Sequence, residues 1–291
     1  MEQVQLLIDA KAALGEGPCW DPVSGRLYWV DILGKRLHIY DPRSQTDRVI
    51  QLDQEVGAVV PRAQGGVVLA LRRGFYALNL DNESLEAIAE PEPDKPNNRF
   101  NDGKCDAKGR FWAGTMDMQE KPGAGKLYRL DPDGTVHTMI DGVTTSNGLV
   151  WSPDRQTMYY IDSPTKQVVA YDYNEESGQI FGKRTVVTLS EGEGVPDGMT
   201  IDEEGMLWVA QWDGHKVSRW DPATGERLSY IELPAARVSS CTFGGDQWDE
   251  LYITTARVGH DEAFLQRYPY AGGVFRVKPG VRGLPTQSYG G

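Results

Sequence analysis

The chain has 291 residues, of which 40% are hydrophobic and 25% charged, a composition typical of a soluble globular protein. Its formal net charge of −12 at pH 7 argues against binding to nucleic acid or to an anionic membrane surface, since both require a basic face. No signal peptide is evident, and no stretch approaches the ~18 apolar residues of a membrane span. The three cysteines lack C-x-x-C spacing, so we expect reduced thiols and a cytoplasmic location.

An internal repeat organises the chain. After a first predicted strand at residues 4–8, one short apolar strand motif recurs six times. The motif occupies residues 27–30, 67–70, 111–114, 158–161, 207–210 and 251–254. A period of 40 to 49 residues is typical of a four-stranded propeller blade. The sequence therefore predicts an all-β protein, a six-bladed β-propeller with four-stranded antiparallel blades around a central tunnel. We expect a single domain over residues 1–291, its ring closed by pairing of residues 4–8 with the last blade.

Other folds explain the pattern less well. A barrel of strands and helices would show a 3.6-residue periodicity between the strands, and none is found. A β-sandwich would not explain the regular period. Long amphipathic helices are absent, and the best helical candidate is the short segment 260–268, within an insertion.

The period breaks at two places. Residues 116–125 in the third unit and 257–272 in the sixth lengthen the turn after the repeated motif. In an antiparallel blade this turn lies on the same face as the start of the first strand. We therefore expect both segments to overhang that end of the tunnel, the first as a lid, although ordinary surface loops would fit equally well.

Polar residues recur at one phase of the repeat. Glu16 and Asn147 precede the repeated motif by 11 residues, and Asn101 and Asp197 precede it by 10. Equal phase in a rotational repeat means equal radius and height, so these four side chains should converge at the tunnel mouth. Oxygen donors grouped in this way suit a hard or borderline divalent cation. No histidine shares the phase, which argues against a multi-histidine zinc site.

Each of these residues also has an ordinary structural interpretation. A lone Asn-Gly or Asp-Gly is usually a turn, because Asn and Asp tolerate left-handed backbone geometry. Glu16 alone would be a solvated glutamate. Their common phase favours the site.

Several ordered motifs resemble the gluconolactonase/regucalcin (senescence marker protein) family of propellers. They are LGEGP (14–18), NRFNDGK (98–104), GTM (114–116), SNGL (146–149), PDG (196–198), FGG (243–245) and AGGVF (271–275). The resemblance covers nearly the whole chain. It implies metal ligation by Glu16, Asn147 and Asp197, and sugar contacts from Arg99 and Asn101. The family often has a substrate-contacting Glu in the lid, where this chain has Gln119 with Glu120 adjacent.

These features predict a carboxylic-ester hydrolase that opens a sugar lactone to its aldonic acid with the help of one divalent cation. A cation would polarise the lactone carbonyl, and Asp197 would bind the cation and act as the general base. The cation could be Ca²⁺, Zn²⁺, Mn²⁺ or Fe²⁺. The alternatives are a metal-dependent phosphotriesterase or other esterase using the same site, and a non-catalytic calcium-binding protein. We expect a monomer or weak homodimer whose only partner is the small-molecule lactone.

Overall fold

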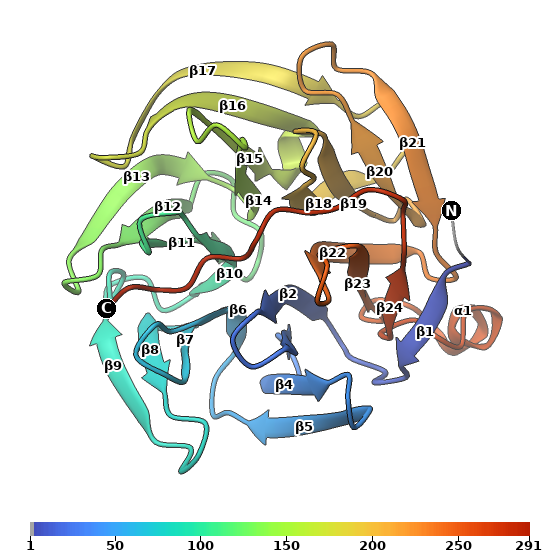
Figure 1. The fold of residues 1–291 in the computed structure, drawn as a ribbon, viewed down its shortest axis with the longest axis horizontal. Helices are drawn as coiled ribbons and strands as arrows, with labels where there is room; N and C mark the ends of the chain where they lie inside the picture. The colour runs from blue at the N-terminus through green and yellow to red at the C-terminus, as the bar shows by residue number, and fades with distance from the viewer. Residues whose placement is uncertain (1–2) are drawn as a thin grey trace.

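The computed structural model describes residues 3–291 and arranges them as six four-stranded antiparallel sheets around a central axis (Figure 1). The predicted six-bladed β-propeller is confirmed. Within each blade the chain runs from the axis to the rim, so the strands are named A to D in that order.

The blades follow the order of the chain. The first contains β2 (Gly15–Asp21), β3 (Arg26–Asp31), β4 (Arg36–Asp41) and β5 (Thr46–Gln51). The second contains β6 (Val56–Pro61), β7 (Val67–Leu71), β8 (Phe75–Leu78) and β9 (Leu85–Ala89). The third contains β10 (Asn98–Cys105), β11 (Phe111–Asp117), β12 (Gly125–Leu130) and β13 (Val136–Val143). The fourth contains β14 (Ser146–Trp151), β15 (Thr157–Asp162), β16 (Gln167–Asn174) and β17 (Gln179–Thr188), with the 3-10 helix η1 (Ser163–Thr165) after β15. The fifth contains β18 (Val195–Ile201), β19 (Leu207–Trp212), β20 (Lys216–Trp220) and β21 (Arg227–Glu232).

Both ends of the chain build the sixth blade. It contains β22 (Arg237–Gly244), β23 (Glu250–Ala256), β24 (Val274–Val277) and, on its outer edge, β1 (Gln5–Ile8). β1 is antiparallel to β24, with Gln5 opposite Arg276 and Leu6 opposite Phe275. The predicted closure of the ring is thus confirmed, since the N-terminal strand pairs with the last strand of the chain.

The repeated apolar motifs form strand B of every blade, as predicted. Strand B has a blade on each side, so nearly every one of its residues is buried, and the repeated motif within it is mostly apolar on both faces rather than alternating. Trp29, Trp112 and Trp208 on these strands are almost completely buried. The Trp208 ring meets Phe243 of the next blade edge-on, with ring centroids 5.8 Å apart, which illustrates how neighbouring blades pack.

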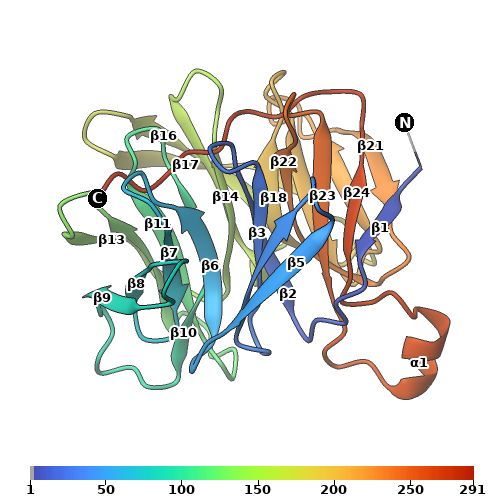
Figure 2. The same ribbon diagram turned by 60° about the horizontal axis from the view of Figure 1, so that its bottom comes forward.

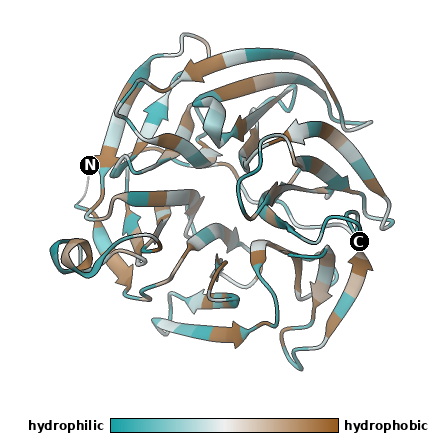
Figure 3. Ribbon diagram, turned by 180° about the vertical axis from the view of Figure 1, so that it is seen from behind, coloured by the Kyte–Doolittle hydropathy of each residue, from teal (hydrophilic) through white to brown (hydrophobic). Residues whose placement is uncertain are grey.

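The rim strands face solvent on one side. Hydrophobic and hydrophilic residues alternate along several of them (Figure 3). β5 and β17 are mostly exposed, in contrast to the strands near the axis. The three cysteines are free and buried. Within the described residues no helix is long and apolar enough to cross a membrane.

The longer insertion contains α1 (Glu262–Arg267), close to the predicted helical segment 260–268. Asp261 caps it by accepting a hydrogen bond from the backbone N of Phe264 at 2.8 Å. The helix protrudes from one face of the disc (Figure 2), but it lies at the outer edge beside β1 (Figure 1). The expectation that this whole insertion overhangs the tunnel is therefore wrong for α1. Tyr268, directly after α1, packs against His215 in the loop between β19 and β20 of the fifth blade, with ring centroids 5.3 Å apart.

The C-terminal segment crosses the other face of the disc (Figures 1 and 2). It is attached at one side by an antiparallel bridge between Gly283 and Asp202. At the other side the backbone N of Tyr289 donates to Pro61 O at 2.8 Å. Residues 284–287 span the gap between these attachments, and we call residues 282–291 the C-terminal strap.

Candidate functional site

The first strand of every blade contains a β-bulge at the phase identified in the sequence. The register shifts directly at or after Glu16, Gly57, Asn101, Asn147, Asp197 and Ser239, one position in each blade. A bulge bends the strand and re-aims a side chain. The six bulges lie at the same end of the tunnel, and four of them present Glu16, Asn101, Asn147 and Asp197.

The glycines after Asn147 and Asp197 pack tightly against the next blade and do not form turns. A Cβ on Gly148 would lie 2.7 Å from the backbone N of Met199. A Cβ on Gly198 would overlap the side chain of Ser240. The interpretation of Asn147-Gly148 and Asp197-Gly198 as ordinary turns is therefore wrong, because both pairs lie inside strands β14 and β18.

Glu16, Asn147 and Asp197 form the centre of the site, and all three are buried. The carboxyl groups of Glu16 and Asp197 lie close enough for each to act on the pKa of the other. Asn147 Nδ2 donates to Ser163 Oγ at 2.8 Å, and Ser163 Oγ donates to Pro196 O at 2.7 Å. Asn147 Oδ1 is buried and has no hydrogen-bond partner among residues 3–291.

The electrostatics of this centre are those of crowded, buried acids. Burial, and then the nearby Asp102 carboxylate, raise the pKa of Glu16 to about 8. Burial, and then Glu16 and Asp102, raise the pKa of Asp197 well above its usual range. In the absence of a cation this group of acids therefore retains protons at neutral pH.

Arg99 and Asn101 lie beside this centre on β10. Arg99 Nη1 donates to Asn101 Oδ1 at 2.7 Å and to Phe100 O at 2.9 Å. Asn101 Nδ2 donates to Ser146 O at 2.8 Å. Burial lowers the pKa of Arg99 to about 10, and Glu16 is the carboxylate that opposes this most strongly. Arg99 remains charged at neutral pH, and its Nε and Nη2 make no hydrogen bond within residues 3–291.

Gln119 and Glu120 lie on the exposed loop between β11 and β12, within the shorter of the two insertions. The backbone N of Gln119 donates to Asp117 Oδ1 at 2.8 Å, which shapes the turn. Glu120 adopts a left-handed backbone with φ of 57°. The charge of Glu120 acts on Arg99, whereas the Gln119 side chain makes no hydrogen bond to the site within the part of the chain that the structure describes.

Three neighbours of the site were missed in the sequence. Asp102 follows Asn101 within the same bulge, Ser163 fixes the amide of Asn147, and Glu55 acts electrostatically on Arg99. Glu55 had a detectable signal: it precedes its repeated motif by 12 residues, as Arg99 does. Ser163 had none, because it belongs to η1, an element outside the repeat.

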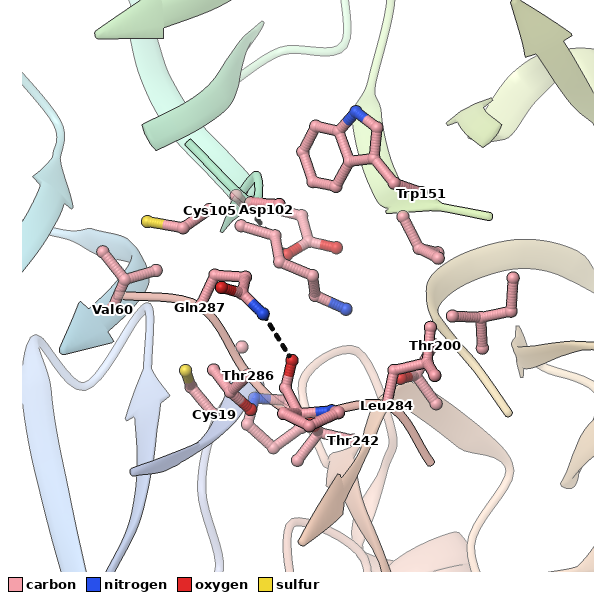
Figure 4. A pocket seen from close by; sticks show the side chains of 18 of the residues that line it. Cys19, Val60, Asp102, Cys105, Trp151, Thr200, Thr242, Leu284, Thr286 and Gln287 are labelled. Atoms are coloured by element: carbon pink, nitrogen blue, oxygen red, sulfur yellow. Dashed lines mark hydrogen bonds between the residues drawn. The ribbon is translucent and has the colours of Figure 1, made fainter. Parts of the chain in front are cut away.

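Below the site, towards the far end of the tunnel, lies a cavity of about 210 Å³. Asp102, Thr200, Thr242 and residues of the C-terminal strap line it (Figure 4). Lys104 Nζ also faces this cavity and donates to Met199 O at 2.9 Å. The strap thus covers the far end of the tunnel, which leaves the bulged end as the open mouth.

The donor set fits a divalent cation. Two carboxylates and one amide oxygen converge, and the amide oxygen is an orphaned buried acceptor, which is costly unless a ligand satisfies it. No three His, Cys, Asp or Glu side chains form a cluster suited to a metal ion anywhere in residues 3–291. Any cation held here would therefore depend on the amide oxygen as its third protein ligand.

Comparisons with known proteins identify the class. The chain matches the SMP-30/Gluconolactonase/LRE-like region over residues 14–257 and belongs to this family. It is 42% identical to "Putative sugar lactone lactonase YvrE" of Bacillus subtilis, covering 97% of each chain. It is 44% identical to regucalcin of Danio rerio, covering 99% of each chain.

Solved structures agree. A calcium-binding protein, regucalcin, from Agrobacterium tumefaciens superimposes with a TM-score of 0.94 at 28% identity, covering 98% of this chain and 96% of the other. The family resemblance deduced from the ordered motifs is thereby confirmed, and it extends over the full length of the relatives.

Proposed function

We propose that this protein hydrolyses a sugar lactone to the aldonic acid with the help of one divalent cation. The observation that carries the proposal is the unpartnered, buried Asn147 Oδ1 beside the paired carboxyl groups of Glu16 and Asp197. Membership of a family with a relative named for sugar lactone lactonase activity supports the substrate class. The calcium-binding regucalcin structure supports the involvement of a cation.

Glu16, Asn147 and Asp197 would hold the cation. When bound, a cation in this position supplies Lewis-acid polarisation of the lactone carbonyl and stabilises negative charge on its oxygen. Its binding requires ionised carboxylates, so the protons retained by Glu16 and Asp197 would be released.

The other steps, proton transfer and substrate binding, fall to side chains around the cation position. Asp197 is the candidate general base that removes a proton from the attacking water. Arg99 directs its uncommitted Nε and Nη2 donors towards sugar hydroxyls, while Asn101 fixes its guanidinium. Gln119 and Glu120 stay candidates for a lid contact, because their loop follows β11 on the same face.

Proton release from D-glucono-1,5-lactone tests the proposal. Activity over background is expected to disappear on chelation, to return with one or more of Ca²⁺, Zn²⁺, Mn²⁺ and Fe²⁺, and to fall at least about 10³-fold in Asp197→Ala. Asp221→Ala, which removes a carboxylate from a turn on the opposite face, is the matched control. Cation binding without turnover of any aldonolactone would reject the lactonase and favour the non-catalytic calcium-binding alternative.

A further inference from the structure

Glu55 is the blade-two counterpart of Arg99. Glu55 and Arg99 each precede the repeated motif of their blade by 12 residues. The pairing agrees with this spacing: Arg99 lies opposite Met116, and the backbone O of Glu55 accepts from the backbone N of Arg72 at 2.8 Å. Residues 72 and 116 both lie five positions after the start of their motif. Rotation by one blade therefore superimposes the two positions.

The two positions are also neighbours in space. β6 packs directly on β10, and a Cβ on Gly57 would overlap the backbone of Phe100 and Asn101. Glu55 is among the carboxylates whose charge opposes the lowering of the Arg99 pKa by burial. The Glu55 carboxylate and the Arg99 guanidinium thus lie at equal height on adjacent blades at the tunnel mouth.

One oxygen of Glu55 accepts no hydrogen bond within residues 3–291. This atom, Glu55 Oε2, is shielded from solvent, although the side chain is 16% exposed, and it forms a long ion pair with Arg72 Nη1 at 3.8 Å. The Arg72 guanidinium is held by another contact, in which its Nη2 donates a hydrogen bond to Pro96 O at 2.7 Å. A buried carboxylate oxygen without a donor is costly, and a ligand hydroxyl would relieve that cost.

Glu55 faces a cavity large enough for a sugar. The cavity measures about 710 Å³ and is lined by Glu55, Arg72, Glu90, Glu92, Asn98 and Phe100, among others. It adjoins the candidate cation ligands without including them, and Phe100, whose backbone O accepts from Arg99 Nη1, is where it borders the site. The other two glutamates in its wall are already satisfied. Glu90 accepts from the Tyr76 hydroxyl at 2.5 Å, and Glu92 accepts from Asn98 Nδ2 at 2.9 Å.

We propose that Glu55 accepts a hydrogen bond from a hydroxyl group of the lactone and, opposite Arg99, makes the site selective for neutral polyhydroxylated lactones. This inference rests on the proposed lactonase function and deepens it. A charge-assisted hydrogen bond to a partly buried carboxylate distinguishes a hydroxyl from a hydrogen, because the deoxy ligand leaves the carboxylate oxygen without a donor. The same carboxylate repels a substrate that carries an anionic group at that position.

The test compares a hydroxylated lactone with an unsubstituted one. In Glu55→Ala, kcat/KM for D-glucono-1,5-lactone should fall about 10-fold or more, while kcat/KM for δ-valerolactone should change less than about 2-fold. Glu55→Gln keeps the size of the side chain but loses its charge, so its kcat/KM for D-glucono-1,5-lactone should lie between those of wild type and Glu55→Ala. Glu86→Gln, on the exposed rim strand β9 of the same blade, is the control and should match wild type.

A non-hydrolysable ligand separates the two proposals. Calorimetric binding of 1,5-anhydro-D-glucitol, a cyclic polyol without a lactone carbonyl, should be weakened in Glu55→Ala by a similar factor. Suppose that the wild type hydrolyses lactones. If Glu55→Ala lowers kcat/KM equally for both lactones, or for neither, the Glu55 proposal is overturned and the lactonase stands. If the wild type hydrolyses no lactone, the lactonase falls, and unchanged polyol binding in Glu55→Ala would overturn the Glu55 proposal as well.

Discussion

Burial gives Glu16, Asn147 and Asp197 properties that the same residues would lack on the surface. The two acids are crowded enough to retain protons, and the Asn147 amide oxygen is left without a donor. Both features are unfavourable in the isolated protein. A protein usually retains such unfavourable polar groups where they serve a site, and here a cation would satisfy all three residues together.

Glu16 makes the stability of the cation-free protein depend on pH. Its pKa is raised from an ordinary value of 4.5 to about 8 in the folded protein. The folded state therefore binds more protons than the unfolded state between these values. The stability that this proton provides is fully present below pH 4.5 and is lost as the pH rises through 8. We expect the Tm of the chelated protein to fall between pH 5 and pH 8.

The variant Glu16→Gln isolates this contribution. It cannot ionise, so its Tm should fall less steeply with pH than that of the wild type in chelator, measured by calorimetry at matched ionic strength. Added cation should flatten the wild-type profile, because it takes the place of the proton. Parallel wild-type and Glu16→Gln profiles would contradict the raised pKa.

At the scale of strands, the bulge explains how an antiparallel blade directs a polar side chain into a tunnel mouth. Tight packing of adjacent A strands requires glycine after the bulged residue in blades four and five, at Gly148 and Gly198. Gly198→Ala should therefore destabilise the protein by ~1–3 kcal/mol through overpacking, measured by urea denaturation. It should also weaken cation binding, since Asp197 is displaced.

A matched control is available for this prediction. Gly290→Ala lies on the exposed part of the strap, where a Cβ would make only an ordinary contact, 3.4 Å from Pro132. It should cost less than ~0.5 kcal/mol. Equal effects of the two variants would mean that the bulge tolerates a side chain.

The strands also show what the sequence could and could not predict. Spacing identified strand B of each blade and the convergence of Glu16, Asn101, Asn147 and Asp197, because a rotational repeat converts phase into position. Bulges were not predicted, since Asn-Gly has the same local preference in a bulge as in a turn. The position of α1 was missed for another reason: an insertion has no repeat to locate it, and its aromatic packing against the fifth blade decides where it lies.

At the scale of the whole molecule, the disc has one open and one covered end. The C-terminal strap reaches from the fifth blade to the second and third across the end opposite the site. Tyr289 anchors it, with its side chain almost fully buried and its hydroxyl donating to Asp131 O at 2.9 Å. Because this anchor and the candidate cation ligands lie at opposite ends of the tunnel, stability and cation binding should be separable.

Tyr289→Ala tests that separation. Loss of a buried aromatic side chain should reduce the free energy of unfolding by ~3–5 kcal/mol, while Tyr230→Ala, on the exposed face of β21, should cost less than ~1 kcal/mol. The cation affinity of the folded Tyr289→Ala protein, measured by calorimetry well below its Tm, should stay within about 2-fold of wild type, since neither Asn147 nor the paired carboxyl groups contact the strap. A fall of 10-fold or more in affinity, without unfolding, would show instead that the strap and the site act as one unit, coupled through the tunnel cavity that Asp102 lines.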